Sequence, residues 1–328
     1  MGNKLLEVKG LKTYFHTFKG VVKAVDGISF SLDKGEVLGI VGESGSGKSV
    51  TSFSILKLVE EPGVVEAEKV MFKGEDLAKK SEKEMMKVRG KEISMIFQDP
   101  MTSLNPLYTI QQQIEEMLIL HGNLNESQRK ERCIELLKSV GIPNPEHRLK
   151  AYPHEFSGGM RQRVIIAIAL AANPTLIIAD EPTTALDVTI QSQILKLMKE
   201  LVENNDASLI LITHDLAVVS ETADKIVVMY CGKIVEEGST RDIINNTAHP
   251  YTKGLLNSIP KLSKDSHRLE QIPGMVPNMF DLPKGCKFAP RCKYCQEKCL
   301  NEEPVKAIMR EGHYTACHFP LKGGHKFE

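Results

Sequence analysis

The sequence predicts an α/β fold with an inserted helical region and a small, irregular C-terminal extension. Short apolar strand-like runs alternate with helix-forming segments, which is typical of an α/β domain. Residues 99–156 are dominated by apolar residues at helical spacing. After residue 240 the periodic pattern fades, and proline, glycine and cysteine become frequent.

The first strands lead into a glycine loop. Residues 4–40 alternate apolar and polar residues in short runs, which predicts a β-rich region. The run "EVLGIV" (36–41) predicts a buried strand, and "KSVTSFSILKLV" (48–59) predicts the helix that follows it.

The remaining elements are predicted in the same way. "TLIIA" (175–179) and "SLILIT" (208–213) are short apolar runs typical of buried strands. "KIVVMYCGKIVEEG" (225–238) predicts a hairpin with "CGK" as its turn. We therefore expect a core of residues 1–98 and 157–240, a helical subdomain of residues 99–156 and an extension of residues 241–328.

Composition limits the possible functions. The 328 residues include 42 Lys and Arg against 42 Asp and Glu, so the formal net charge is zero. This balance argues against nucleic acid as a partner, because duplex-binding proteins usually carry a basic excess. No apolar run reaches ten residues and no secretory signal is visible, so we expect a cytoplasmic protein. In that compartment thiols stay reduced, and clustered cysteines suggest a metal more than disulfides.

The stretch "GESGSGKS" (42–49) predicts a phosphate-binding loop between a strand and a helix. Its glycines let successive backbone N–H groups face one anion, and the start of the helix adds a positive dipole. Lys48 fits a contact with the β- and γ-phosphates, and the Ser49 hydroxyl fits Mg²⁺. A simple glycine-rich turn is a poor alternative here. The expected nucleotide contacts are Gly42, Glu43, Ser44, Gly45, Ser46, Gly47, Lys48, Ser49 and Val50.

Polar residues at the ends of three strands predict the hydrolytic chemistry. In "LIIADEP" (176–182), we expect Asp180 to bind Mg²⁺ and Glu181 to act as the general base for the attacking water. His214 in "SLILITHD" fits a contact with the γ-phosphate, and Gln98 in "IFQDP" fits Mg²⁺ and water. Taken singly, each has a purely structural alternative.

A second anion site is predicted at a helix start. "FSGGMRQR" (156–163) opens the apolar helix "VIIAIALAA", and Ser157 precedes Gly158 and Gly159 there. An ordinary capped helix is the alternative for this segment alone.

Together these motifs resemble the nucleotide-binding subunits of ATP-binding cassette (ABC) transporters over residues 4–240. The resemblance implies a P-loop NTPase core with an antiparallel β subdomain. It also implies that Ser157, Gly158 and Gly159 cap the ATP of an opposite subunit, and that Asp187 in "TALD" (184–187) lines the dimer interface. Phe15, or else Tyr14, would stack on adenine. Phe156 and Met160 replace the leucine and glutamine of the commonest signature.

"IFQDPMTSLNP", "HPYTKGLLNSIP" and "GCKFAPRC" further resemble the ATPases of dipeptide and oligopeptide permeases. This implies peptide import, with nickel or sugars as alternative substrates. The implied partners are a second, related ATPase chain (or a second copy), two membrane-spanning permease subunits and, indirectly, a peptide-binding protein. The chain would sit peripherally on the cytoplasmic face of the cell membrane.

Five cysteines lie close together in the extension, between residues 286 and 317. The set Cys286, Cys292, Cys299 and Cys317 resembles a pattern that holds a [4Fe–4S] cluster in many of these ATPases. The spacing Cys292-x₂-Cys295 leaves a zinc site as the alternative, so Cys295 is either a ligand or a spare. Cys133 and Cys231 lie in helical and strand patterns and are expected in the core.

Two rival functions remain. A soluble cassette ATPase acting on DNA or the ribosome usually carries a long coiled-coil insert, tandem cassettes or a basic surface, and none of these is visible here. A metal-sensing regulator with a vestigial ATPase site is disfavoured by the intact set of Lys48, Asp180, Glu181 and His214.

Overall fold

The computed structural model describes residues 4–99, 103–122, 124–184, 186–259 and 271–321. These residues form two compact units. Of the described residues, the first unit contains those within 4–32, 36–78 and 213–321, and the second contains those within 33–35 and 79–212.

The first unit begins with an antiparallel sheet in the strand order β2-β1-β5-β6, with β4 paired to β1. Apolar residues of the long first strand, including Leu6, Val8 and Leu11, are buried. The sheet consists of β1 (Lys4–Thr17), β2 (Gly20–Asp33), β4 (Gly63–Glu66), β5 (Lys69–Phe72) and β6 (Glu75–Asp76). The predicted antiparallel β region is thereby confirmed.

A second set of strands in this unit follows the order β12-β13-β11-β10-β3. Only β3 and β10 are parallel within this set. The strands are β3 (Val37–Val41), β10 (Lys225–Tyr230), β11 (Lys233–Ser239), β12 (Ala307–Arg310) and β13 (His313–Thr315). The predicted hairpin is β10–β11, and its turn residues Cys231 and Gly232 both have positive φ angles.

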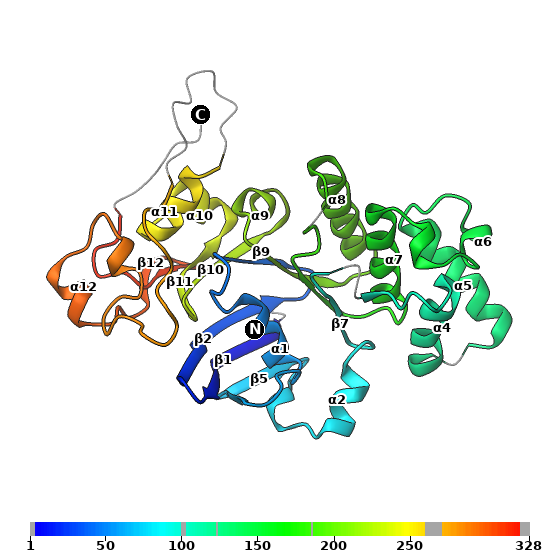
Figure 1. Ribbon diagram of the computed structural model, residues 1–328, viewed down its shortest axis with the longest axis horizontal. Helices are drawn as coiled ribbons and strands as arrows, with labels where there is room; N and C mark the ends of the chain where they lie inside the picture. Colours follow the sequence, from blue (N-terminus) through cyan, green and yellow to red (C-terminus); the bar gives the residue numbers. More distant parts are fainter. Residues whose placement is uncertain (1–3, 100–102, 123, 185, 260–270, 322–328) are drawn as a thin grey trace, which may run out of the picture. The chain divides into compact units, whose positions relative to one another are not determined.

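The helices of the first unit are short. They are α1 (Lys48–Ile55), η1 (Leu77–Lys79), α9 (Leu216–Thr222), α10 (Thr240–Asn245), α11 (Pro250–Asn257), η3 (Ala289–Arg291) and α12 (Glu297–Asn301). Helix α1 directly follows the phosphate loop. The elements from α11 to β13 lie within the predicted extension, and β13 pairs with β11. Figure 1 shows α11, α12 and β12 near β11.

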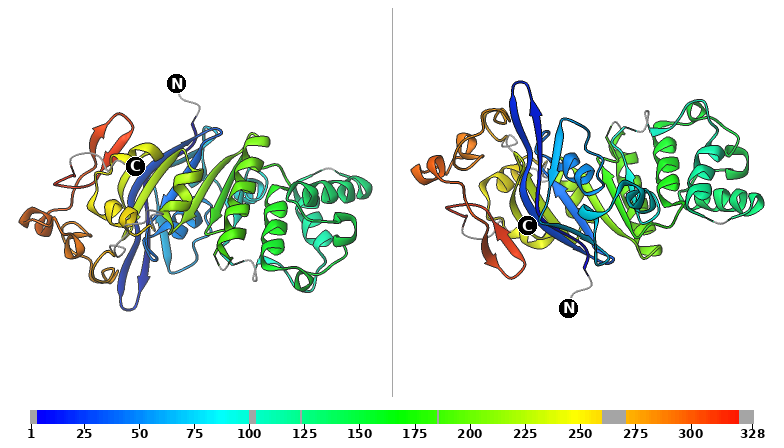
Figure 2. Two further views of the ribbon diagram at one scale, coloured as in Figure 1. Left: turned by 90° about the horizontal axis from the view of Figure 1, so that it is seen from above. Right: turned by 90° about the horizontal axis from the view of Figure 1, so that it is seen from below.

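The second unit contains three parallel strands in the order β9-β8-β7, together with most of the long helices. The strands are β7 (Ile93–Ile96), β8 (Leu176–Asp180) and β9 (Ser208–Thr213). The helices are α2 (Glu82–Val88), α4 (Ile110–His121), α5 (Glu126–Ser139), α6 (Pro145–Arg148), η2 (Pro153–Glu155), α7 (Gly158–Leu170) and α8 (Val188–Asn204). Figure 2 shows α4 to α7 gathered into one helical cluster in both views.

The α/β class and the inserted helices are therefore confirmed. In the part of the chain that the structure describes, no helix is long and apolar enough to cross a membrane.

Candidate nucleotide site

Two glycines of the phosphate loop lie so close to neighbouring backbone that no side chain would fit. A Cβ atom on Gly47, whose φ angle is +100°, would lie 2.2 Å from the backbone oxygen of Ala24. A Cβ atom on Gly42 would lie 2.2 Å from the backbone oxygen of Met229. The loop then passes into α1 through Gly47, so the N-terminal end of this helix points into the curl.

Two polar side chains in the loop fit an anionic ligand. Lys48 is buried, and its Nζ donates hydrogen bonds to the backbone oxygens of Gly42 (2.8 Å) and Glu43 (3.1 Å). The buried Ser46 hydroxyl finds no hydrogen-bond partner among the described residues. A phosphate oxygen in the loop would satisfy this hydroxyl, so the loop fits the triphosphate that the motif predicts.

The structure brings Gln98 and Glu181 together at the carboxyl ends of two parallel strands. Glu181 follows β8, and Gln98 follows the neighbouring β7. The Glu181 carboxylate accepts hydrogen bonds from Gln98 Nε2 (3.1 Å) and from the Thr184 hydroxyl (3.0 Å). Both donors are neutral, and they orient the carboxylate.

The backbone of Glu181 is also unusual. Its φ angle is +45°, a conformation that residues other than glycine seldom adopt, and its N–H donates to the Ile212 carbonyl oxygen (2.8 Å). Strained backbone of this kind is concentrated at functional sites. Asp180, one residue earlier, is 3% exposed at the end of β8. His214 is exposed immediately after β9.

The predicted second anion site lies at the N-terminal end of α7. The Ser157 side chain caps this helix by accepting a hydrogen bond from the Met160 N–H (3.3 Å). Asp187 caps the neighbouring α8 in the same way, accepting from the Ile190 N–H (3.0 Å). Both capping residues are exposed, and Ala185 of the predicted "TALD" segment lies outside the described residues.

Close packing between these helices explains one glycine of the signature. A Cβ atom on Gly159 would lie 2.8 Å from a side-chain carbon of Ile190. The replacement of the usual leucine by Phe156 is also accommodated, because Phe156 is buried beneath the guanidinium of Arg148.

The two aromatic candidates for adenine face in opposite directions on β1. Tyr14 donates a hydrogen bond to Asp26 (2.5 Å), and burial together with Asp26 raises the pKa of its hydroxyl. Phe15 lies on the same side of the strand as Thr13, whose hydroxyl is 2.6 Å from that of Ser54 on α1. Phe15 therefore lies on the side of β1 that faces the helix of the phosphate loop.

The cysteine-rich segment corrects a prediction. Among the described residues, no group of three or more His, Cys, Asp or Glu side chains is arranged to hold a metal ion. The predicted [4Fe–4S] cluster on Cys286, Cys292, Cys299 and Cys317 is therefore wrong, and the zinc alternative has no support.

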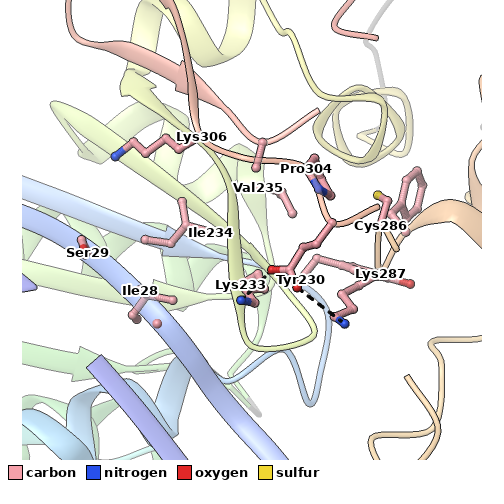
Figure 3. A pocket seen from close by; sticks show the side chains of 14 residues that line it. Ile28, Ser29, Tyr230, Lys233, Ile234, Val235, Cys286, Lys287, Pro304 and Lys306 are labelled. Carbon is pink, nitrogen blue, oxygen red and sulfur yellow. Dashed lines mark ion pairs between the residues drawn. The ribbon is translucent and has the colours of Figure 1, made fainter. Parts of the chain in front are cut away.

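The surroundings of the thiols give the physical reason. The four cysteines line a small pocket together with apolar groups such as Phe288 and Phe319. Burial raises the pKa of Cys292 and of Cys317 to about 11, which favours the neutral thiol over the thiolate that metals bind. Cys286 also borders a second cavity, lined by Tyr230 and Lys287 (Figure 3). In this structure the four thiols pack beside apolar rings.

Buried hydrogen bonds hold the extension in place instead. The fully buried Glu236 on β11 accepts hydrogen bonds from the N–H groups of Ala248 (2.6 Å) and His249 (3.0 Å). Its carboxylate also lies 2.9 Å from Nε2 of the buried His313. These contacts fix Ala248, His249 and His313 against β11.

Sequence reasoning missed two residues that contact the phosphate loop. Arg291 forms a two-point ion pair with the Glu43 side chain, and the Tyr251 hydroxyl accepts a hydrogen bond from the Glu43 N–H. Arg291 belongs to the stretch "GCKFAPRC" (285–292), in which it follows Pro290.

Comparison with known proteins agrees with this geometry. The family model described as "ABC transporter" matches residues 25–184. The dipeptide transport ATP-binding protein DppD of Escherichia coli (strain K12) is 52% identical over 317 residues, covering 97% of both chains.

This chain belongs to the ABC transporter family of ATP-binding proteins. A second model, "Oligopeptide/dipeptide transporter, C-terminal region", matches residues 235–299. The oligopeptide transport ATP-binding protein OppD of Bacillus subtilis (strain 168) is 55% identical, covering 95% of this chain and 88% of its own. A dimeric bacterial ABC transporter cassette has a similar structure, with a TM-score of 0.63 and 29% identity over 72% of this chain and 99% of that chain. The predicted family and its ATPase activity are thus confirmed.

Proposed function

We propose that this ABC ATPase powers the import of di- and oligopeptides through separate membrane subunits. The observation that carries the hydrolytic part is the Glu181 carboxylate, held by Gln98 and Thr184 at the end of β8. The peptide substrate is supported by the names of the relatives and by the matched C-terminal region.

In the proposed reaction, Glu181 accepts a proton from water as the water oxygen attacks the γ-phosphorus of ATP, and ADP leaves. Gln98 fixes the carboxylate through its amide, and His214 contacts the γ-phosphate. Lys48 and the backbone of residues 42–50 bind the phosphates, while Phe15 stacks on the adenine. Ser49, Asp180 and Gln98 are the proposed Mg²⁺ ligands, and the ion would neutralise charge on the phosphate oxygens.

We further propose that two such subunits enclose the nucleotides. The exposed Ser157, together with Gly158 and Gly159, would cap the ATP held by the opposite subunit, and Asp187 would line the interface. The neighbouring Val188 is 82% exposed and would lie within this interface.

The helical region of the second unit is the proposed docking surface for the membrane subunits. Leu107 and Tyr108 follow Gln98 in the chain by only a few residues and are 80% and 51% exposed. A membrane subunit covering them would bury apolar surface close in sequence to a residue of the hydrolytic site. The chain would then work peripherally at the cytoplasmic face of the membrane.

Purification of the native complex and its reconstitution into vesicles test this function. We expect the chain to copurify with membrane-spanning subunits, and we expect uptake of a labelled dipeptide only when ATP is present on the side of this subunit. Uptake of nickel or a sugar in place of the dipeptide would contradict the proposed substrate.

The trans role of Ser157 has its own test. Ser157→Arg places a long cation at the exposed start of α7, so we expect normal ATP binding to the isolated chain but little hydrolysis by the complex. Lys196→Arg, an exchange of cations on the exposed face of α8, serves as the control. Wild-type hydrolysis by the Ser157→Arg complex would refute the role in trans.

A further inference from the structure

The extension contacts the phosphate loop through one buried arginine. The Arg291 side chain is 5% exposed, and its two terminal nitrogens donate to the two carboxylate oxygens of Glu43, at 2.6 and 3.0 Å. Glu43 is the second residue of the loop. This two-point geometry is the strongest form of arginine–carboxylate contact.

The arginine is itself held on several sides. Its Nε donates to the Pro273 carbonyl oxygen (3.0 Å), and one terminal nitrogen donates to the Tyr230 hydroxyl (3.3 Å). The rings of Tyr230, Tyr251 and Phe288 pack against one another with centroids 4.7–5.3 Å apart. Hydrogen bonding with Glu43 raises the pKa of Arg291, so the guanidinium remains charged.

Glu43 is therefore fixed at three points. Its side chain binds Arg291, and its N–H donates to the Tyr251 hydroxyl (2.9 Å). Its carbonyl oxygen accepts the hydrogen bond from Lys48 (3.1 Å). Two of the three contacts come from the extension, and the third involves the lysine that the phosphates require.

We propose that Arg291 is a positioning residue for nucleotide binding, through which the C-terminal extension sets the phosphate loop for ATP. The proposal rests on the assignment of residues 42–50 as the ATP phosphate site. Arg291 turns the Glu43 carboxylate toward the extension and neutralises it, and it thereby keeps a negative charge from repelling the incoming triphosphate.

Calorimetric titration with Mg·ATP tests this inference on the isolated full-length chain. We expect Arg291→Gln to weaken ATP binding by roughly tenfold or more, because it leaves the Glu43 charge without its partner beside the phosphate site. Arg291→Lys keeps a positive charge but loses the two-point contact, so its affinity should lie between those of Arg291→Gln and wild type.

The double variant Glu43→Gln/Arg291→Gln separates charge from packing. It removes both members of the pair, so we expect it to bind Mg·ATP more tightly than Arg291→Gln alone. If the fold-loss of affinity in the double variant equals the product of the fold-losses in the two single variants, the two residues are not coupled and the proposal fails.

Lys306→Gln is the matched control for a loosened extension. Lys306 joins the extension to the core through Glu237 (2.6 Å) but does not touch the phosphate loop. We expect a lower unfolding temperature and unchanged Mg·ATP affinity for this variant. An equal loss of affinity in Lys306→Gln and Arg291→Gln would reduce Arg291 to a general structural role.

The outcomes also separate this inference from the proposed ATP site. If the wild-type chain and Lys48→Ala bind Mg·ATP equally, then the assignment of the phosphate site fails. If Lys48→Ala loses affinity while Arg291→Gln retains it, only the role of Arg291 fails. If Arg291→Gln does not fold, the Mg·ATP affinities of Arg291→Lys, Glu43→Gln and wild type are compared in the same titration. Equal affinities for all three proteins overturn the inference.

Discussion

The phosphate loop and the cysteine-rich segment 286–317 both attract attention in the sequence, but the structure uses them differently. In the loop, an aligned helix start, a buried lysine and the Ser46 hydroxyl, which has no partner among the described residues, converge on one anion site. In the cysteine segment, the thiols gather around apolar rings, and burial favours their neutral form. The loop therefore presents polar donors to one ligand, whereas the thiols pack together with apolar groups.

Breaking the loop should have the larger effect. We expect Lys48→Ala to weaken Mg·ATP binding by about tenfold to a hundredfold, because a hydrogen bond from a charged donor contributes about 1.5–3 kcal/mol. Calorimetric titration measures this loss. Lys34→Ala, at an exposed turn residue, is the control. Wild-type affinity in Lys48→Ala would show that the loop does not bind the nucleotide.

The buried contacts of Glu236 with His249 and His313 should make the stability of the protein depend on pH. His249 caps α11 by accepting the Tyr251 N–H through Nδ1 (3.1 Å), and burial lowers the pKa of His249 to about 4 despite the nearby Glu236. Between pH 6.5 and 4 the unfolded chain binds a proton at this residue that the folded chain does not. The free energy of unfolding should therefore fall by up to about 3 kcal/mol as the pH decreases through this range.

Denaturant unfolding of wild type and His249→Asn across this pH range checks the assignment. Asparagine preserves a capping oxygen but does not titrate, so the difference in stability between the two proteins should shrink or reverse as the pH falls. If the difference in free energy of unfolding between the two proteins does not change with pH, His249 is not the source of the pH dependence.

Changes to the thiols should matter least. Cys299 is 7% exposed, so Cys299→Ser buries a hydroxyl and should lower the free energy of unfolding by about 1–3 kcal/mol. The less buried Cys295, whose thiol lies outside the shared pocket, should tolerate serine within about 0.5 kcal/mol. ATP hydrolysis should be unchanged in both variants. Loss of hydrolysis in Cys299→Ser with normal stability would contradict the packing role.

The sequence predicted the parts of the site that follow from local order. The loop at residues 42–49 is contiguous in the sequence. Gln98 and Glu181 could be assigned to the same site because each follows a predicted strand and both belong to the motifs of the resembled family. The contact between Arg291 and Glu43 joins residues 248 positions apart, so no local pattern could reveal it. The surroundings of the cysteine thiols could not be predicted, because the spacing of cysteines in the sequence does not determine how far each thiol is buried.

Glu181→Gln tests the central claim, hydrolysis by a carboxylate held between neutral donors, most directly. The substitution keeps the shape and the contacts with Gln98 and Thr184 but removes the base. The account predicts wild-type Mg·ATP affinity and a loss of turnover of roughly 10²–10⁴-fold in the reconstituted complex, with Glu203→Gln on the exposed end of α8 unchanged. Near-normal turnover in Glu181→Gln would contradict it.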